Sequence, residues 1–440
     1  MKKRSLLVRI LLCCIGIQTL CSCAMFKENR SYQVRELVPD GAWTWFNDER
    51  VIIDGQMLLI GSLDSSGTAR VDLFDMQNQT RTDYPLSSWQ SVDDHNNPAL
   101  LKMSNGNILA CYAQHHRQKQ WYWRTAAVED NNDHPVLEWS PEHIFQVPAA
   151  TTYCNLIQLA DENNRIYNFS RNVGFNPNLQ YSDDHAQSWQ GPFVLIQSGD
   201  NRTRPYVKYA DNGKDRIDFL YTDGHPRNEP TNNVYHLYYQ KGGFYRTDGT
   251  LIKTIDQLKE EPMVPTDGTL IYDGRTDGPG WVWDIEYDKD GNPVAAFINS
   301  VDHAEGNDLR YRYARWNPVA RQWTQRQIAF AGTHLYVPEN HYAGGIAIDP
   351  QDADTVYISC DVEPESGKPN VSGRYQIYQG KTVDRGNTWQ WRQLTFNTGV
   401  DNLRPVVPRH QNRRMCVIWL QGQYKTYTDF KTKIVGIIEK

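Results

Sequence analysis

Short apolar runs separated by turn residues dominate the chain. Gly, Asn, Asp and Pro lie between the runs, and few runs exceed the length of a single strand. Only residues 255–261 look helical, and we expect a local turn there. This pattern predicts an all-β fold. The clearest expected strands are residues 51–53, 57–60, 108–112, 217–221, 235–239, 294–298, 355–359 and 415–420.

A repeated motif indicates which all-β architecture is present. Residues 382–389 (TVDRGNTW) match the Asp-box pattern S/T-x-D-x-G-x-x-W, and residues 182–189 (SDDHAQSW) match it except for Ala186 in the glycine position. The Asp and Ser/Thr of such a box bond the backbone of a tight hairpin, and the Trp packs between sheets. The copies start 200 residues apart, which fits four blades of roughly 50 residues each. Six to eight blades are possible, and we predict a seven-bladed β-propeller that forms one domain over residues 33–440.

Two histidines flank one expected hairpin. His95 lies in the polar segment 93–98 (DDHNNP), and His115 follows the apolar run 108–112. Residues 104–107 (SNGN) supply the turn between them, so the two ends of the hairpin should meet at one edge. Histidine is the side chain best suited to proton transfer near neutral pH. The spacing therefore predicts a catalytic pair, with His116 turned to the opposite face.

The N-terminus has the pattern of an export signal. A basic head and a short apolar core precede Leu20-Cys21-Ser22-Cys23, which resembles a bacterial lipoprotein signal with Cys23 as the lipidated residue. An ordinary secretory signal is the alternative. We expect residues 1–23 to be the signal and residues 24–32 a tether. The protein would then be exported and held at the outer membrane by a lipid anchor.

Composition narrows the possible partners. The formal net charge of −6 gives no basic surface for nucleic acid. Four cysteines lie outside the signal, at 111, 154, 360 and 416, each in an apolar run without a CxxC pair, so we expect buried thiols. The 25 Tyr and 14 Trp in a polar chain are typical of a surface that stacks on sugar rings, although most should fill sheet cores.

Six further segments are distinctive: 41–46 (GAWTWF), 93–98 (DDHNNP), 204–209 (RPYVKY), 222–227 (TDGHPR), 341–345 (HYAGG) and 402–405 (NLRP). Together they resemble the BNR-4 type seven-bladed propellers. This group includes ulvan lyases and L-rhamnose–glucuronate lyases, and its fold is shared by exo-α-L-rhamnosidases that act on arabinogalactan. The resemblance implies a polysaccharide lyase that cleaves an L-rhamnose–D-glucuronate type linkage of ulvan or gum arabic by β-elimination, without a cofactor.

The resemblance also implies a set of working residues. His95 and His115 match the two active-site histidines of the ulvan lyases. Arg171 is expected to pair with the uronate carboxylate, for which guanidinium geometry is suited. Tyr153 is expected to be the phenol that acts as acid or base, with its pKa lowered by Arg171.

Other residues are weaker candidates. Arg204, Tyr206, Trp283, His341 and Arg404 line the expected funnel and would bind substrate, or else serve in packing and ion pairs between blades. The resemblance admits a structural zinc near His225 and His236, but the companion cysteine is absent there, so the metal content is left open.

Two alternatives belong to other functional classes. The rhamnosidases carry a histidine in a Trp-Phe-x-Asp segment, and here that position is Asn47, which cannot take a proton from water. This departure argues against a hydrolase. A glycan-binding protein without catalysis would keep the aromatic residues but would not need two converging histidines.

Overall fold

The structure is a computed structural model that describes residues 32–88, 91–131, 134–199, 203–396, 399–409 and 415–439. The predicted signal, its lipidation site Cys23 and most of the predicted tether lie outside the described residues. Val34–Lys440 form one compact unit. Among the described residues, no helix has the length and apolar character required to cross a membrane.

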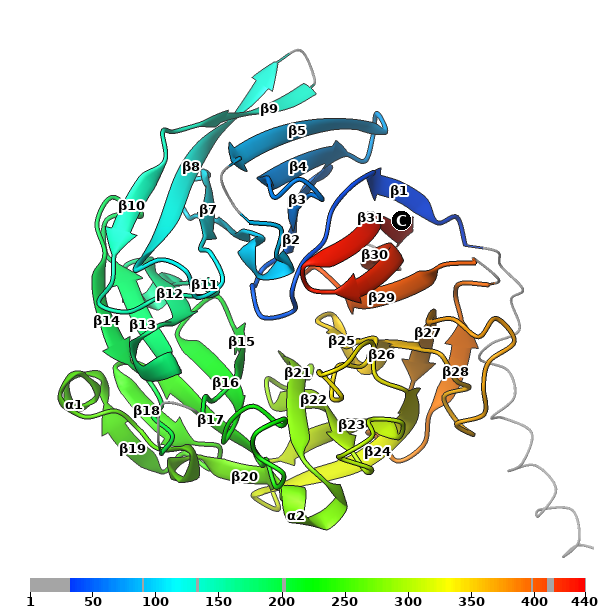
Figure 1. Cartoon of the computed structure of the whole chain (residues 1–440). Coiled ribbons are helices and arrows are strands. Elements are labelled where there is room, and N and C mark those ends of the chain that lie inside the picture. Colours follow the sequence, from blue (N-terminus) through cyan, green and yellow to red (C-terminus); the bar gives the residue numbers. More distant parts are fainter. Residues whose placement is uncertain are drawn as a thin grey trace, which may run out of the picture. The chain divides into compact units, whose positions relative to one another are not determined.

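Seven antiparallel sheets surround a central axis, and each sheet forms one blade (Figure 1). The predicted all-β, seven-bladed propeller in one domain is therefore confirmed. The first three blades are β2 (Val51–Asp54), β3 (Met57–Leu63), β4 (Ala69–Asp75) and β5 (Thr80–Ser87); β6 (Ala99–Lys102), β7 (Ile108–Tyr112), β8 (Gln120–Asn131) and β10 (His143–Gln146), with β9 (His134–Trp139) paired to β8; and β11 (Leu156–Leu159), β12 (Arg165–Arg171), β13 (Pro177–Ser182) and β14 (Gln190–Val194).

The next three blades follow in chain order. They are β15 (Val207–Asp211), β16 (Arg216–Thr222), β17 (Val234–Gln240), β18 (Gly243–Arg246) and β19 (Leu251–Thr254), with β20 (Thr269–Tyr272) paired to β17; β21 (Gly280–Tyr287), β22 (Pro293–Ser300), β23 (Leu309–Asn317) and β24 (Gln322–Gly332); and β25 (Ile346–Asp349), β26 (Asp352–Cys360), β27 (Gln376–Lys381) and β28 (Gln390–Gln393). Short helices include α1 (Ile255–Glu260), at the expected turn, and α2 (Gly274–Asp277).

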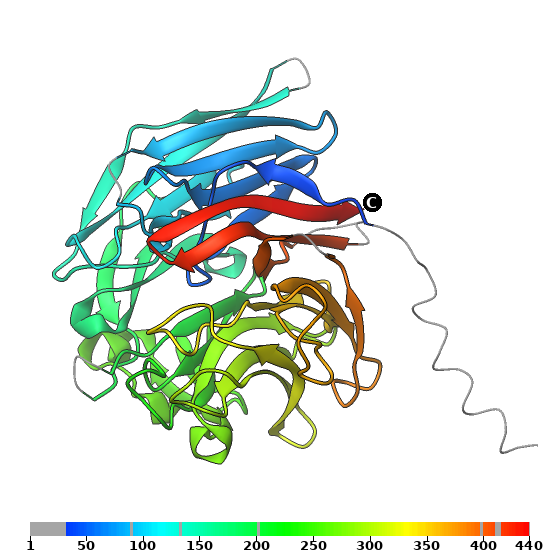
Figure 2. The ribbon, with the colours of Figure 1, turned by 45° about the vertical axis from the view of Figure 1, so that its right-hand side comes forward.

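The last blade joins the two ends of the propeller. It contains β29 (Asp401–Val406), β30 (Met415–Thr426), β31 (Asp429–Glu439) and, as its outer strand, β1 (Arg35–Val38). Figure 2 shows the long β30–β31 hairpin (red) beside β1 (blue). Because the first and last strands share one sheet, the backbone hydrogen bonds of that sheet close the ring.

Both Asp boxes have the expected geometry. In the box between β27 and β28, the Thr382 hydroxyl accepts from the Gly386 N–H at 2.9 Å, and Asp384 accepts from the Thr388 N–H at 2.8 Å. The box between β13 and β14 repeats these bonds with Ala186 at φ +67°. The Trp389 ring packs 5.1 Å from Tyr313 of the preceding blade. The boxes are therefore structural, as the sequence predicts.

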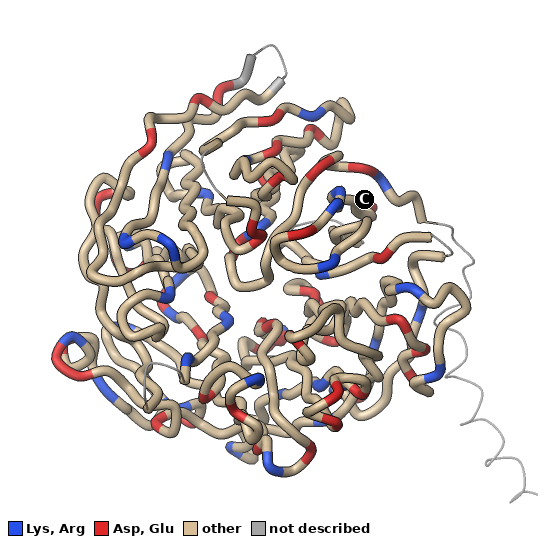
Figure 3. The backbone as a smooth tube through the Cα atoms, in the orientation of Figure 1, with Lys and Arg blue, Asp and Glu red and all other residues tan. Residues whose placement is uncertain are grey.

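Buried apolar side chains from several blades form one large hydrophobic cluster. The four remaining cysteines are buried and free, as expected. Acidic and basic residues are distributed around all the blades (Figure 3).

Candidate active site

The segment between β5 and β6 holds His95 in a short 3-10 turn, η1 (Asp94–Asn96). The Asp93 carboxylate caps the turn by accepting from the His95 N–H at 3.1 Å. The His95 ring nitrogen Nδ1 lies 2.7 Å from Asp93 Oδ1 and 3.0 Å from Asp94 Oδ1. Since Nδ1 is engaged by two carboxylates, Nε2 is the nitrogen left to meet a substrate.

His115 reaches the same carboxylate from the end of β7. Its Nδ1 lies 2.9 Å from Asp93 Oδ2, and its backbone N–H donates to Asn96 Oδ1 at 2.8 Å. The His95 and His115 rings stack with centroids 4.0 Å apart and planes 12° apart. The structure thus brings together the two histidines at the ends of the predicted hairpin. The His116 ring instead packs on Phe175.

The two imidazoles that share the Asp93 carboxylate have different pKa values. Burial alone would lower the pKa of His95, but Asp93 and Asp94 outweigh it and raise that pKa to about 9. Burial and the charge of His95 lower the pKa of His115 to about 4, against the opposing effect of Asp93. The pair therefore carries one extra proton across the neutral range, on His95.

Tyr427, at the tip of the β30–β31 hairpin, borders both rings. Its ring lies edge-on to His95 at 5.2 Å and to His115 at 5.7 Å, and its backbone carbonyl accepts from the Asp94 N–H at 2.9 Å. Sequence reasoning missed this residue because no motif connects the last blade with the 93–98 segment.

Arg171, at the end of β12, lies beside two tyrosines. Its guanidinium donates to the Tyr206 hydroxyl at 2.7 Å and to Thr152 Oγ1 at 3.3 Å, and its Cζ lies 4.8 Å from the centroid of the Tyr153 ring. The Tyr153 ring lies 5.6 Å from that of His95. All four predicted catalytic residues are therefore neighbours in one cluster.

The two tyrosines differ in a way that the sequence did not predict. Burial, followed by the nearby Tyr206, holds the pKa of Tyr153 well above its ordinary value, although Arg171 acts in the opposite direction. For Tyr206, burial is outweighed by Arg171 and Arg204, so its pKa is lowered. The arginines therefore lower the net pKa of Tyr206, whereas the pKa of Tyr153 stays raised despite Arg171.

The predicted substrate-binding residues have different surroundings. Arg204 and Tyr206 adjoin the Arg171 cluster: both guanidiniums lie over the Phe175 ring, at 5.7 Å for Arg204 and 5.9 Å for Arg171. His341 is 3% exposed, and both of its ring nitrogens are buried without a hydrogen-bond partner.

Trp283 and Arg404 are both buried and have contacts within the protein. Trp283 stacks on Trp45 at 4.1 Å and lines a small pocket with Asp48, Asp284 and other residues. Arg404 is 1% exposed; it pairs with Asp94 and donates to the Trp43 carbonyl at 2.6 Å. These contacts are those of the ion-pair role that the sequence also allowed, and through Asp94 they hold the segment that carries His95.

His225 and His236 do not form the zinc site considered from the sequence. His225 Nε2 lies 3.4 Å from Glu339, which also pairs with Arg227. His236 is held by Asp218 and Thr247, each at 2.8 Å. Because the two imidazoles have separate partners, these residues do not fit a shared metal.

Asn47 braces the floor of the site. Its amide nitrogen donates to the His95 carbonyl at 3.0 Å, and its oxygen accepts from the Cys154 N–H at 3.0 Å. It is 1% exposed, so the position at which the rhamnosidases carry a histidine here has a structural role.

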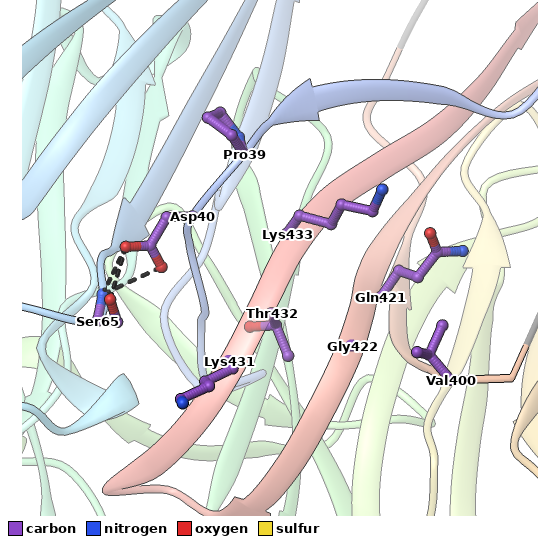
Figure 4. A pocket seen from close by; sticks show the side chains of 9 residues that line it. All are labelled: Pro39, Asp40, Ser65, Val400, Gln421, Gly422, Lys431, Thr432 and Lys433. Atoms are coloured by element: carbon purple, nitrogen blue, oxygen red, sulfur yellow. Dashed lines mark hydrogen bonds between the residues drawn. The ribbon is translucent and has the colours of Figure 1, made fainter.

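A surface pocket of about 620 Å³ lies over the last blade (Figure 4). It is lined by polar and small side chains, among them Asp40, Gln421, Lys431 and Lys433. None of the predicted site residues lines it, and no aromatic ring offers a platform for a sugar.

The protein is a seven-bladed propeller whose candidate site combines a buried arginine with two histidines that share one carboxylate. Residues 45–331 match the BNR repeat-containing family, and the chain belongs to that family. No curated protein matches the sequence.

Solved structures share the fold over nearly the whole chain. A PL25 ulvan lyase bound to a GlcA(1-4)-linked, 3-sulfated rhamnose fragment is 12% identical, with a TM-score of 0.67, covering 93% of this chain and 96% of that chain. A second solved structure of a PL25 ulvan lyase is 12% identical with a TM-score of 0.68, covering 92% of this chain and 96% of that chain. Polysaccharide lyase Uly1 is 12% identical with a TM-score of 0.59, covering 92% and 97%. At this identity the likeness establishes the fold.

Proposed function

We propose that the chain is a polysaccharide lyase that cleaves a uronate-containing polysaccharide by β-elimination. The observation that carries the proposal is the environment of Arg171. Its side chain is 4% exposed, and among the described residues its hydrogen-bond partners are hydroxyl groups, with no carboxylate in an ion pair. A buried charge without a counter-ion is unfavourable by several kcal/mol. A substrate carboxylate would supply the missing anion with bidentate geometry.

The reaction makes three demands on the site. A base removes the proton on C5 of the uronate, and the electrons of that bond form the C4–C5 double bond. The bond from C4 to the leaving O4 then breaks, and an acid gives O4 a proton. A cation beside the uronate carboxylate stabilises the negative charge that develops after the C5 proton is removed and before O4 leaves.

The electrostatics of the cluster support an assignment for each demand. Arg171, with Arg204 beside it, neutralises the carboxylate. His115 accepts the C5 proton, because it is neutral and its side chain is 22% exposed against 6% for His95. Tyr153, with its raised pKa, keeps its proton and donates it to O4. Protonated His95 supplies positive charge beside the site.

Tyr206 is the second group able to accept a proton, since its pKa is lowered. Phenylalanine at this position keeps the ring and removes the hydroxyl. If His115 is the base, Tyr206→Phe lowers the rate less than His115→Ala does. If Tyr206→Phe lowers the rate more than His115→Ala does, Tyr206 is the base.

The substrate is proposed from the resemblance and from the relatives. We expect an L-rhamnose–D-glucuronate type linkage, as in ulvan or gum arabic, because the similar ulvan lyase is described with a glucuronate–rhamnose fragment. The Asn47 brace gives no support to the rhamnosidase alternative.

The test is ultraviolet absorbance of the 4,5-unsaturated uronate on ulvan and gum arabic. A lyase gives the signal, a hydrolase releases rhamnose without it, and a binding protein shows affinity without product. His95→Ala and Arg171→Ala should abolish the signal, whereas His185→Ala, at an exposed position of an Asp box, should not. Full activity in either of the first two variants refutes the assignment.

The location is a separate proposal based on the N-terminal sequence. We propose that the protein is exported and anchored in the outer membrane through a lipid on Cys23. Labelled fatty acid should enter the wild-type protein and not the Cys23→Ala variant. Equal labelling of both would overturn the proposal.

A further inference from the structure

Two loops near Glu339 contain an unusual number of buried polar atoms without partners. They are residues 301–308, after β22, and residues 333–342, after β24. Unsatisfied atoms include His303 Nδ1, both ring nitrogens of His341 and Asn340 Oδ1. Each such atom destabilises a fold by roughly 1–3 kcal/mol unless something occupies it. Because these atoms lie on two neighbouring loops, one bound group placed between the loops would satisfy more than one of them.

The two loops are clamped together in a fixed geometry. Asn340 Nδ2 donates to the Ala304 carbonyl at 2.7 Å, and the His334 N–H donates to the Gly306 carbonyl at 2.9 Å. Gly306 has φ +66°, and a Cβ there would lie 2.4 Å from the Asn340 carbonyl, so only glycine allows this approach. The His303 and His341 rings are consequently held 5.1 Å apart at 71°.

The chemistry of the unsatisfied atoms restricts the ligand. A neutral imidazole offers a nitrogen lone pair, and both ring nitrogens of His341 are buried without a hydrogen-bond partner. Two imidazole nitrogens and an amide oxygen suit a borderline metal such as Zn²⁺ or Ni²⁺. Ca²⁺ and Mg²⁺ prefer all-oxygen sites.

A sugar is a poor fit for the same atoms. The His341 nitrogens are buried from solvent, so a bulky hydroxylated ring cannot reach them without opening the loops. A metal ion binds imidazole nitrogen at about 2.0–2.1 Å and could satisfy several of these atoms at once.

We propose that His303 and His341, completed by Asn340, form a binding site for a divalent transition-metal ion of the zinc type. The ion would tie loop 301–308 to loop 333–342. This site differs from the group formed by Asp93, His95 and His115, whose ligating atoms lie within 4.8 Å of one another. In that group both Nδ1 atoms are already bonded to Asp93.

The test uses the whole exported chain after treatment with a chelator and does not depend on enzymatic activity. Titration calorimetry with Zn²⁺ should give one equivalent bound, and Ca²⁺ should give no binding. His303→Ala and His341→Ala should each weaken Zn²⁺ binding at least about tenfold. His185→Ala and His115→Ala should leave the affinity unchanged.

Zinc-edge X-ray absorption provides a measurement on the unmodified protein, should a variant fail to fold. Two imidazole nitrogens and at least one oxygen around the ion are expected. Absence of Zn²⁺ binding, or an all-oxygen shell, overturns the proposal. So does loss of binding in His115→Ala with full binding in the double variant His303→Ala/His341→Ala, because the ion would then occupy the histidine pair of the active site.

Discussion

The imidazole rings of His95 and His115 lie parallel, 4.0 Å apart, and each Nδ1 contacts a different oxygen of the Asp93 carboxylate. Two protonated rings so close together would repel each other. The single Asp93 carboxylate therefore favours a pair that holds one extra proton. Because that proton is on His95, His95 is a cation and the neutral His115 can act as a base.

Asp93→Asn should disable the pair without removing either imidazole. The amide keeps the size of the side chain, but it cannot balance the charge on His95, so the rings lose both orientation and asymmetry. We expect kcat to fall about 10²- to 10⁴-fold. The measurement is the rate of formation of unsaturated uronate, and Asp83→Asn, whose side chain is 45% exposed, is the control. Unchanged kcat would show that Asp93 only caps the turn.

The pH dependence of activity should be bell-shaped. Below about 4, His115 gains a proton and can no longer act as the base. Above about 9, His95 loses the proton that keeps positive charge beside the substrate. Initial rates on both sides of these two values, at constant ionic strength, test this. A rate that rises steadily through pH 9 would exclude a role for protonated His95.

Arg171→Lys keeps the positive charge and loses the planar fork. Because the proposed role is bidentate contact with a carboxylate, lysine should not replace arginine, and kcat/KM should fall about 10²- to 10³-fold. Arg165→Lys is a matched control on the same strand, since Arg165 is partly exposed and pairs with Asp183. Equal activity of both variants would mean that Arg171 serves only to pack Tyr153 and Tyr206.

The sequence was sufficient to predict the fold because its signals are local. The Asp boxes at 182–189 and 382–389 specify hairpins through bonds within eight residues, and their spacing limits the propeller to six to eight blades. The meeting of His95 and His115 also follows from one hairpin, with its turn at residues 104–107. These inferences required no knowledge of how distant blades pack.

The rest of the site depends on contacts between segments far apart in the chain. Arg404 reaches Asp94 across 310 residues, and Tyr427 reaches His95 from the last blade. Nothing in the local sequence separates an arginine that lines a funnel from one that is buried behind it. The relative acidity of Tyr153 and Tyr206 likewise depends on the placement of Arg171 and Arg204 in three dimensions.

The pair formed by Arg404 and Asp94 should make the active-site segment depend on closure of the ring. Both side chains are at most 1% exposed, and the Tyr424 hydroxyl also donates to Asp94 at 2.5 Å. Arg404→Met removes the cation and leaves a buried carboxylate with reduced compensation. We expect the free energy of unfolding to fall by about 3–5 kcal/mol, measured by urea denaturation.

The double variant Arg404→Met/Asp94→Leu separates the charge from the packing. Because it removes both charges, it should recover part of the lost stability, although His95 then keeps only Asp93 as a counter-ion and its pKa should fall. Activity should consequently decline at a lower pH on the alkaline side than in the wild-type protein. If Arg404→Met lowers the free energy of unfolding by less than 1 kcal/mol, the last blade does not support the 93–98 segment through this pair, and the backbone bond from Asp94 to Tyr427 would be the remaining connection.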